Sequence, residues 1–413
     1  MKVFYVVQRY GREVVGGAEG ACRQLARHLA PHADVTVFTT CALEATTWAN
    51  HYPSGESAED GIRVVRFPVT GGRDMGFLRM SRKVFSRPDP PLKLQQEWVR
   101  AQGPESPGLI TAIAARAGEP DLWIFYTYLY YPTVLGLPIV GPRALLHPAL
   151  HDEPAARLPI VRDAVRSAAA LSLQTHEEWE LVLRLVGWPP AMVGMVGMGV
   201  EEGTGDVAAF RARFGLGSDP YLLYLGRVDR GKGTDDLAAA FAGGKQRQRG
   251  SWGPLKLVMA GPVVHQPLEG REHPDVIVTG RLSDDERWAA LEGCEMFAQP
   301  SVNESFGLSL IEAWTKGKPA LVSAHGPVTS GHVRRARGGL TYADPVEFDA
   351  AVDVLLSDPR GAGRLGSNGR KYAEEYLWDR VSIRYRAFVE QVAAAVAGRG
   401  AGSRLTPAGS NDH

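Results

Sequence analysis

The chain has 413 residues, in which 46 Lys and Arg balance 46 Asp and Glu. This length exceeds one ordinary hydrophobic core, so we expect two domains of roughly 150 to 200 residues. Because the positive and negative side chains cancel, no global field favours nucleic acid or a membrane, and partners must be recognised by local patches.

Cysteine usage and the N-terminus predict a soluble protein of the cytoplasm. Cys22, Cys41 and Cys294 are odd in number and share no metal-ligand spacing, which fits a reducing compartment better than a disulfide framework. The first apolar run, residues 3–7, is too short for a signal peptide. No uninterrupted apolar run approaches the roughly 18 residues of a transmembrane helix, so we expect neither export nor a membrane span.

The N-terminal half alternates predicted strands and helices. Residues 2–7 are short, apolar and rich in β-branched and aromatic side chains, which is typical of a buried parallel strand. Residues 34–40 and 62–67 continue the alternation of strands and helices. Gly16 and Gly17 follow the first strand and precede a helix with apolar periodicity, which is where open α/β sheets bind ligands. A turn that needs positive φ explains this glycine pair about as well.

A basic and apolar segment, residues 71–107, interrupts the alternation. We interpret it as an insertion that covers one end of the sheet. The alternative is a basic amphipathic helix within residues 71–93 that lies on an anionic membrane or grips a charged acceptor. The cations of this segment are Arg73, Arg79, Arg82, Lys83, Arg87 and Lys93.

Residues 143–154 combine a short strand with a loop that contains His147, His151 and two acids. Titratable groups at the carboxyl end of a strand lie at the edge where ligands bind. Metal binding is one interpretation of the two histidines, but Pro148 argues against a regular helix that presents both, and no third ligand is marked out. We therefore expect no metal site here.

A second α/β region follows an expected strand at residues 168–175. Pro and repeated Gly in residues 188–203 suit a hinge between domains. Residues 221–241 then restart the pattern with a strand, a basic loop and a helix. Arg227 and Lys232 stand in that loop, where two cations could neutralise a pyrophosphate.

The remaining elements complete the second region and the C-terminus. Residues 372–396 predict one long amphipathic helix with Trp378 as a packing anchor, and residues 398–413, rich in Gly, Ser, Pro and polar side chains, predict a disordered tail. Further strands are expected within residues 121–134, 255–262, 275–282, 294–301 and 318–323.

The stretch NESFGLSLIEAW, residues 303–314, places Glu304 and Glu312 on either side of an expected helix start. A helix over residues 306–314 would offer its free N–H groups and dipole to a phosphate, and Gly307 would let a ligand approach the main chain. The carboxylates could accept hydrogen bonds from hydroxyls on each side, as a nucleotide sugar requires. An ordinary surface helix capped by Asn303 or Ser305 is the alternative.

The paired glutamates, with Phe-Gly-Leu after the first, resemble a signature of retaining glycosyltransferases of family 4, the glycogen-synthase-like group. The Gly-Arg and Lys-Gly of residues 226–233 resemble a second one. The resemblance implies an α/β protein of GT-B fold, with two doubly wound Rossmann-like domains facing a central cleft. It implies an N-terminal domain over residues 1–190, a donor domain over 195–375, and a C-terminal helix, 376–396, that returns to the first domain.

The resemblance also implies roles for single residues. His151 is expected to contact the donor sugar near its reacting carbon, with Asp152 orienting the ring. Glu304 is expected to hold the sugar hydroxyls and Glu312 the ribose.

Other residues are implied around the phosphates, the acceptor and the base. Arg227 and Lys232 are the expected cations on the diphosphate, and the loop at Thr279 is expected to receive the base. The implied binding residues are Gly16, Gly17, Glu19, Gly226, Gly280, Arg281, Leu282, Ser305, Phe306, Gly307, Leu308 and Ser309.

The implied activity is transfer of a sugar from a nucleoside diphosphate sugar to a hydroxyl of a glycan, lipid-linked or small-molecule acceptor, with retention of configuration. Cell-surface glycan, glycolipid or secondary-metabolite biosynthesis would be the setting, in the cytoplasm or at the inner face of its membrane. The chain contains no Asp-x-Asp, and two fixed cations can replace a metal, so we expect no cofactor. The alternatives are a nucleotide-sugar epimerase or hydrolase, and a non-catalytic nucleotide-sugar binding protein.

One segment departs from the family pattern. A Gly-Gly with a Glu soon after is usual beyond the strand at 318–323, whereas this chain has HGPVTSGHVRRARGG. Gly326, Gly331, Arg334 and Arg335 are the residues through which this loop could still act. The base, whether of UDP, GDP, ADP or dTDP, and the sugar are not identified by the sequence.

Overall fold

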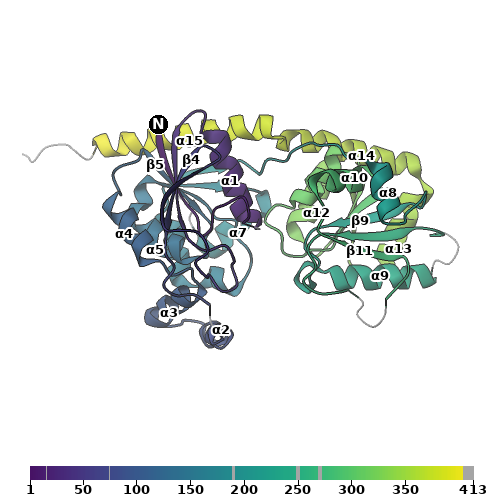
Figure 1. Cartoon of the computed structure of the whole chain (residues 1–413), viewed down its shortest axis with the longest axis horizontal. Coiled ribbons are helices and arrows are strands. Elements are labelled where there is room, and N and C mark those ends of the chain that lie inside the picture. The colour runs from purple at the N-terminus through teal and green to yellow at the C-terminus, as the bar shows by residue number, and fades with distance from the viewer. Residues whose placement is uncertain (15, 74, 188–190, 248–251, 268–271, 403–413) are drawn as a thin grey trace, which may run out of the picture. The chain divides into compact units, whose positions relative to one another are not determined.

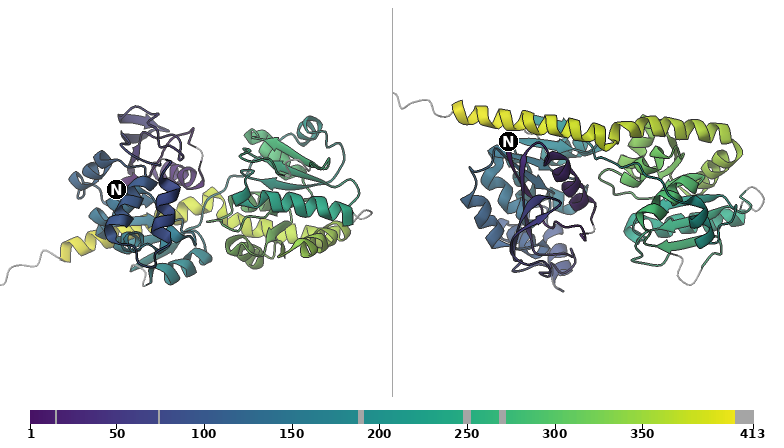
Figure 2. Two further views of the ribbon diagram at one scale, coloured as in Figure 1. Left: turned by 90° about the horizontal axis from the view of Figure 1, so that it is seen from below. Right: turned by 45° about the horizontal axis from the view of Figure 1, so that its top comes forward.

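The structure is a computed structural model that describes every residue except 15, 74, 188–190, 248–251, 268–271 and 403–413. The chain forms two compact units (Figure 1). Unit 1 holds Met1–Val196 and the chain from Ser382 onward, and unit 2 holds Gly197–Val381. Each unit contains one sheet with helices packed on it, as the two further views in Figure 2 show.

The sheet of unit 1 has the strand order β3-β4-β2-β1-β5-β6-β7-β8. All neighbouring pairs are parallel except β3 with β4, which forms an antiparallel edge. The strands are β1 (Lys2–Val6), β2 (Asp34–Thr40), β3 (Gly55–Glu59), β4 (Ile62–Phe67), β5 (Leu122–Tyr126), β6 (Ala144–His147), β7 (Ala170–Leu173) and β8 (Met192–Met195).

The core of unit 1 is aromatic at its centre. The Phe4 ring lies 4.9 Å from that of Phe38 and 5.1 Å from that of Trp123, and all three side chains are buried. The helices are α1 (Gly17–Leu29), α2 (Phe77–Phe85), α3 (Leu92–Gln102), α4 (Pro107–Ala115), α5 (Tyr131–Val140), η1 (Gly141–Arg143), η2 (Pro154–Arg157), α6 (Pro159–Ser167) and α7 (His176–Val186).

The sheet of unit 2 is parallel throughout, in the order β11-β10-β9-β12-β13-β14. Its strands are nearly continuous apolar runs because helices cover both faces. The strands are β9 (Tyr221–Leu225), β10 (Lys256–Ala260), β11 (Val276–Gly280), β12 (Met296–Gln299), β13 (Ala320–Ser323) and β14 (Gly339–Tyr342).

In unit 2, α9 packs against α13, and α11 packs against α14. Trp252 lies under the first pair, with its ring 5.8 Å from Phe241 and 6.1 Å from Phe348. The helices are α8 (Val207–Arg213), η3 (Arg230–Lys232), α9 (Thr234–Arg247), α10 (Asp284–Gly293), α11 (Leu308–Thr315), α12 (Pro327–Ala336), α13 (Pro345–Ser357), α14 (Pro359–Ala373) and η4 (Glu374–Tyr376).

These sheets confirm the prediction of two doubly wound domains. The strands expected at residues 34–40 and 62–67 have those bounds in the structure. The edge strands β3 and β14 were missed, because β3 is polar and exposed and β14 is short, with a glycine at its start.

The boundary between the two units falls between Val196 and Gly197, inside the segment 188–203 that was interpreted as a crossing with a hinge, but part of this segment is also a strand. Residues 188–190 lie outside the described part of the chain, but Met192–Met195 form β8, which pairs with β7. Gly194 is in this strand because a Cβ there would lie 2.7 Å from the ring of Phe388. The glycine that suggested a hinge is therefore required for packing.

The predicted helix over residues 372–396 is also corrected. The chain leaves the helix at Leu377, where Val200 donates to the carbonyl of Tyr376 at 2.7 Å and accepts from the amide of Trp378 at 3.3 Å. A new helix, α15 (Trp378–Gly402), then begins in unit 2 and continues in unit 1, where the Tyr385 hydroxyl lies 2.7 Å from that of Tyr5. Residues 398–402 are thus helical, and 403–413 lie outside the described residues.

Candidate active site

Three loops of unit 2 leave the same carboxyl edge of the sheet. They follow β9, β11 and β12 and contain most of the predicted donor-binding residues. The strand order reverses between β9 and β12, which are sheet neighbours, and such a switch point is where open α/β sheets bind ligands.

The loop after β9 is fixed by its own polar groups. The Asp229 carboxylate accepts from the amide of Gly231 at 2.6 Å, and the Thr234 hydroxyl donates to the Asp229 carbonyl at 2.9 Å. Gly233 adopts a φ of 72°, and a Cβ there would lie 3.1 Å from the carbonyl oxygen of Pro300. This close approach holds the loop against the one that follows β12.

Lys232 and Glu304, both predicted site residues, are in direct contact. The Lys232 ammonium donates to the Glu304 carboxylate at 2.7 Å, although the two residues are 72 positions apart. The Ser301 hydroxyl also donates to the Lys232 carbonyl, at 3.2 Å. Arg227, in contrast, is half-exposed and lies 3.2 Å from Asp229.

The helix after β12 begins two residues later than predicted. Its first residue is Leu308, because Gly307 adopts a left-handed conformation, with φ 84° and ψ 51°. No side chain caps this start, so it is not a helix capped by Asn303 or Ser305. Phe306 is buried between the rings of His332 and Tyr376, each 5.2 Å away, and anchors the turn.

Glu312 is paired with Arg287, a residue that the sequence interpretation missed. Arg287 lies on α10, whose start is fixed by a capping box of Ser283 and Glu286. The Arg287 guanidinium also lies over the Trp288 ring, 4.5 Å from its centre. Burial raises the pKa of Glu312, and the pair with Arg287 opposes that shift.

The other predicted residues of unit 2 are divided between the carboxyl edge and its surroundings. Gly280 ends β11 with a φ of 73°, and Arg281 and Leu282 follow it at the edge. Gly326 is the N-cap of α12. Arg334 and Arg335 lie in the last turn of α12, at the opposite end of that helix from the carboxyl edge.

In unit 1, the predicted glycine pair lies at the start of α1. Gly16 is the N-cap and Gly17 the first residue. A Cβ at Gly16 would lie 2.2 Å from the Glu19 carboxylate. Glu19 is buried and pairs with Arg9 at 2.5 Å, so its carboxylate is directed to a cation that was not predicted.

The loop after β6 contains His151 and Asp152. Asp152 forms ion pairs with Arg157 and, at 2.5 Å, with Arg184 of α7. Its role towards the His151 ring stays a prediction. His147 is buried and stacked 4.3 Å from Tyr126, and burial lowers its pKa to about 3. Among the described residues, no group of three or more His, Cys, Asp or Glu side chains is arranged to hold a metal ion.

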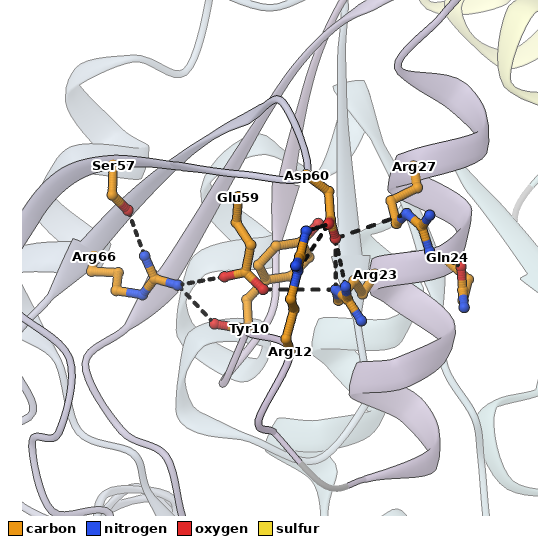
Figure 3. A network of polar contacts seen from close by, with 9 residues as sticks. All are labelled: Tyr10, Arg12, Arg23, Gln24, Arg27, Ser57, Glu59, Asp60 and Arg66. Carbon is orange, nitrogen blue, oxygen red and sulfur yellow. Dashed lines mark hydrogen bonds and ion pairs between the residues drawn. The ribbon is translucent and has the colours of Figure 1, made fainter. Parts of the chain in front are cut away.

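A polar network ties the β3–β4 hairpin to α1 (Figure 3). Arg12 and Arg23 both bind the Asp60 carboxylate, and Glu59 bridges Arg23 at 3.7 Å and Arg66 at 3.1 Å. Burial raises the pKa of Asp60, but the hydrogen bonds from the arginines outweigh it and lower the pKa overall. The network stabilises the antiparallel edge of the sheet.

Residues 206–372 match a family model described as glycosyl transferases group 1. The D-inositol 3-phosphate glycosyltransferase of Streptomyces bingchenggensis is 30% identical over 250 residues, which cover 56% of this chain and 54% of that protein. The enzyme of the same name from Jonesia denitrificans is 28% identical over 280 residues, which cover 61% of this chain and 64% of that protein. The matched region therefore spans less than two thirds of these curated relatives.

Solved structures resemble nearly the whole chain. Sucrose-phosphate synthase from Thermosynechococcus elongatus superposes with a TM-score of 0.68 at 19% identity, covering 96% of this chain and all of that one (100%). Anabaena HepE in complex with UDP-glucose superposes with a TM-score of 0.65 at 17% identity, and the superposition covers 96% of this chain and 100% of that one. At these identities the likeness shows the fold, which is GT-B. Together with the family model over residues 206–372, this fold supports the resemblance to GT-B glycosyltransferases of the family 4-like group.

In the part of the chain that the structure describes, no helix has the length and hydropathy needed to span a membrane.

Proposed function

We propose that this protein is a retaining glycosyltransferase, which moves a sugar from a nucleoside diphosphate sugar to an acceptor hydroxyl. The observation that carries the proposal is the contact between Lys232 and Glu304 at the carboxyl edge, beside an uncapped helix start. A phosphate-binding cation next to a hydroxyl-binding carboxylate suits the junction between a diphosphate and a sugar. Both residues lie within the segment that matches the family model.

The comparisons support the choice of donor class. HepE was solved with UDP-glucose, and the curated relatives are named for transfer to D-inositol 3-phosphate. We propose a nucleoside diphosphate sugar as donor and a hydroxyl of a glycan, lipid-linked or small-molecule acceptor. In this proposal Glu304 binds the sugar, Glu312 binds the ribose with Arg287 positioning it, and the loop at Gly280 receives the base.

The proposed mechanism relies on electrostatic stabilisation. The bond between the anomeric carbon and the diphosphate oxygen breaks, and the acceptor oxygen forms its bond to that carbon on the same face. The acceptor proton passes to the leaving phosphate, so no protein nucleophile is needed. Lys232, Arg227 and the N–H groups at the start of α11 stabilise the charge that develops on the diphosphate. His151 contacts the sugar near the reacting carbon.

We further propose that transfer needs no metal ion. Two fixed cations and a helix N-terminus can together neutralise a diphosphate, a task that a divalent cation performs in enzymes with an Asp-x-Asp motif. Lys232 already occupies a position next to the sugar-binding carboxylate.

Thermal-shift measurements with UDP, GDP, ADP and dTDP, followed by transfer assays with the matching sugars, test the function. A ligand at 100 times its Kd stabilises the folded state by about 2.7 kcal/mol. We expect one of these nucleoside diphosphates to raise the unfolding temperature. We then expect a sugar linked to that same nucleoside diphosphate to be transferred to an acceptor. Turnover without an acceptor would indicate the epimerase or hydrolase alternative. Binding with no turnover would indicate a binding protein, which the altered loop after Ser323 favours.

We also propose that α2 and the turn after it contact an anionic membrane surface. Arg79, Arg82, Lys83, Arg87 and Lys93 are all exposed, and none of them pairs with a carboxylate of the described residues at 4 Å or less. Three apolar side chains are exposed beside them, with fractions of 101% for Met75, 70% for Leu78 and 59% for Leu92. Clustered cations around exposed apolar groups complement anionic lipid headgroups.

Co-sedimentation with vesicles tests this contact. We expect binding to vesicles that contain phosphatidylglycerol and little binding to phosphatidylcholine alone, with loss at high salt. The double variant Arg82→Ser/Lys83→Ser should weaken binding at least tenfold. A control that removes two exposed cations of unit 2, Arg360→Ser/Arg364→Ser, should leave it unchanged. Equal loss in both variants, or none, would rule out a specific role for α2.

A further inference from the structure

Glu178 is a buried carboxylate that the proposed mechanism does not use. It lies in the first turn of α7, and only 2% of it is exposed. Its own amide donates to the N-cap hydroxyl of Thr175 at 3.1 Å. Its carboxylate accepts hydrogen bonds from main chain that lies outside the helix.

The partners of this carboxylate are backbone amides. One oxygen accepts from Gln174 at 2.7 Å, and the other accepts from Leu150 at 2.9 Å. No Lys, Arg or His among the described residues lies within 4 Å of it as an ion-pair partner. A buried acid that binds only main chain fixes the path of that main chain.

The main chain that Glu178 fixes is the loop that carries His151. Ala149 has a φ of 48°, an uncommon conformation for a residue with a Cβ, and the Glu178 carboxylate binds the amide of the next residue, Leu150. On the other side of His151, Asp152 is paired at 2.5 Å with Arg184, which also belongs to α7. Helix α7 thus holds the loop both before and after His151.

We infer that Glu178 is a positioning residue for His151, which it holds through the backbone of Leu150. The inference rests on the proposed function, in which His151 contacts the sugar near its reacting carbon. A displacement of about 1 Å in such a group can lower a rate by roughly a hundredfold. The sequence interpretation assigned the orientation of the His151 ring to Asp152, whose carboxylate binds two arginines, and that assignment stays a prediction.

The carboxylate is chemically specific for this task. An ionised Glu only accepts hydrogen bonds, through two oxygens, whereas a Gln amide would direct its own N–H groups at backbone donors. Burial raises the pKa of Glu178 to about 7, while the hydrogen bonds from Gln174 and Leu150 favour the ionised form. Glu178→Gln keeps the volume and removes one acceptor, so it separates the hydrogen-bonding role from packing.

Steady-state kinetics of Glu178→Gln, His151→Ala and the double variant test the inference. We expect Glu178→Gln to lower kcat at least tenfold. The affinity for the nucleoside diphosphate, measured by calorimetry, should stay within twofold, because the residues that bind it lie in unit 2. If Glu178 acts through His151, the double variant should lose no more than His151→Ala alone. An additive loss, or wild-type kcat in Glu178→Gln, would overturn the inference.

Hydrogen exchange gives a readout that does not depend on activity. The amides of Leu150 and Gln174, which donate to the Glu178 carboxylate, should exchange at least tenfold faster in Glu178→Gln. Glu180→Gln, which changes an exposed acid on the same helix, should match wild type. Unchanged protection at the Leu150 amide would overturn the inference even if the variant were less active. A wild-type protein that transfers no sugar from any donor would instead count against the proposed function.

Discussion

The carboxyl edges of the two sheets hold their charged side chains in different ways. In unit 2, Lys232 and Glu304 both belong to recognisable motifs, and they bind each other. In unit 1, the predicted Glu19 binds Arg9, and the loop of His151 is held by Glu178; the sequence analysis singled out neither Arg9 nor Glu178. Short motifs therefore describe a site completely only where the partners are motif residues too.

The difference follows from how the loops are built. The loops after β9 and β12 leave neighbouring strands at a switch point, so their residues meet directly. The loop after β6 instead receives its support from α7, through a buried carboxylate. Variants in unit 2 should therefore act on donor binding, and variants in unit 1 on the geometry of the loop.

The largest effect that we predict is for Lys232→Ala. Loss of a charged hydrogen bond costs roughly 1.5 to 3 kcal/mol, and more where charge develops in the transition state. Turnover should fall at least tenfold while the variant stays folded. Arg230→Ala is the matched control, because this neighbouring cation is exposed and pairs with Asp235. Wild-type rates for Lys232→Ala would remove Lys232 from the mechanism.

The two glutamates of unit 2 should differ in the half of the donor that they bind. Glu312→Ala should weaken binding of the nucleoside diphosphate about tenfold, because it removes the proposed ribose partner and the hydrogen bond between Arg287 and Glu312. Glu304→Ala should leave the affinity for the nucleoside diphosphate nearly unchanged. It should instead lower the affinity for the complete nucleotide-sugar donor, or the rate at which that donor is turned over. Calorimetric titration of both variants with both ligands distinguishes them. Equal affinities everywhere would reduce this stretch to an ordinary helix start.

Stability should respond to the protonation of Glu178. Its pKa in the folded state is about 7, against an ordinary value of 4.5, so the folded state holds the proton more tightly. Its contribution to stability is therefore fully present below pH 4.5 and is lost as the pH rises through 7. Between pH 4.5 and pH 7, the free energy of unfolding of wild type should fall by roughly 1.4 kcal/mol per pH unit relative to that of Glu178→Gln.

Urea unfolding at pH 4.5 and pH 8 measures this difference. His147 and Tyr126, the titratable groups on the neighbouring strands, and His151 on the loop are common to both proteins and should largely cancel. The Glu180→Gln variant should follow wild type at both pH values. A difference between wild type and Glu178→Gln that does not change with pH would contradict the raised pKa.

The smallest change in turnover that we predict is the one caused by removal of metal ions. Turnover should survive thorough treatment with EDTA, since Lys232 and Arg227 are proposed to neutralise the diphosphate. Loss of activity that magnesium or manganese restores would require a metal site, and the loop of His147, His151 and Asp152 would be the first place to look for it.

The sequence predicted the elements whose physics is local. The run DVTVFTT at residues 34–40 is rich in β-branched and aromatic side chains, which is typical of a buried strand, and its bounds were predicted correctly. The start of α11 was placed two residues too early, because apolar periodicity continues through Phe306 whereas the left-handed Gly307 decides where the helix begins. Helix boundaries depend on single backbone angles that periodicity does not report.

By itself, the sequence determined the two-domain α/β architecture and the residues of the donor motifs, because these depend on periodicity and on short-range spacing. Only the tertiary structure decided which distant residues support them. Arg287 beside Glu312, Glu178 beside Leu150, and Gly194 against Phe388 join positions that are 25, 28 and 194 residues apart in the sequence. A buried charge or a close backbone contact depends on what the fold places beside it, and nothing in the neighbouring sequence reports that partner.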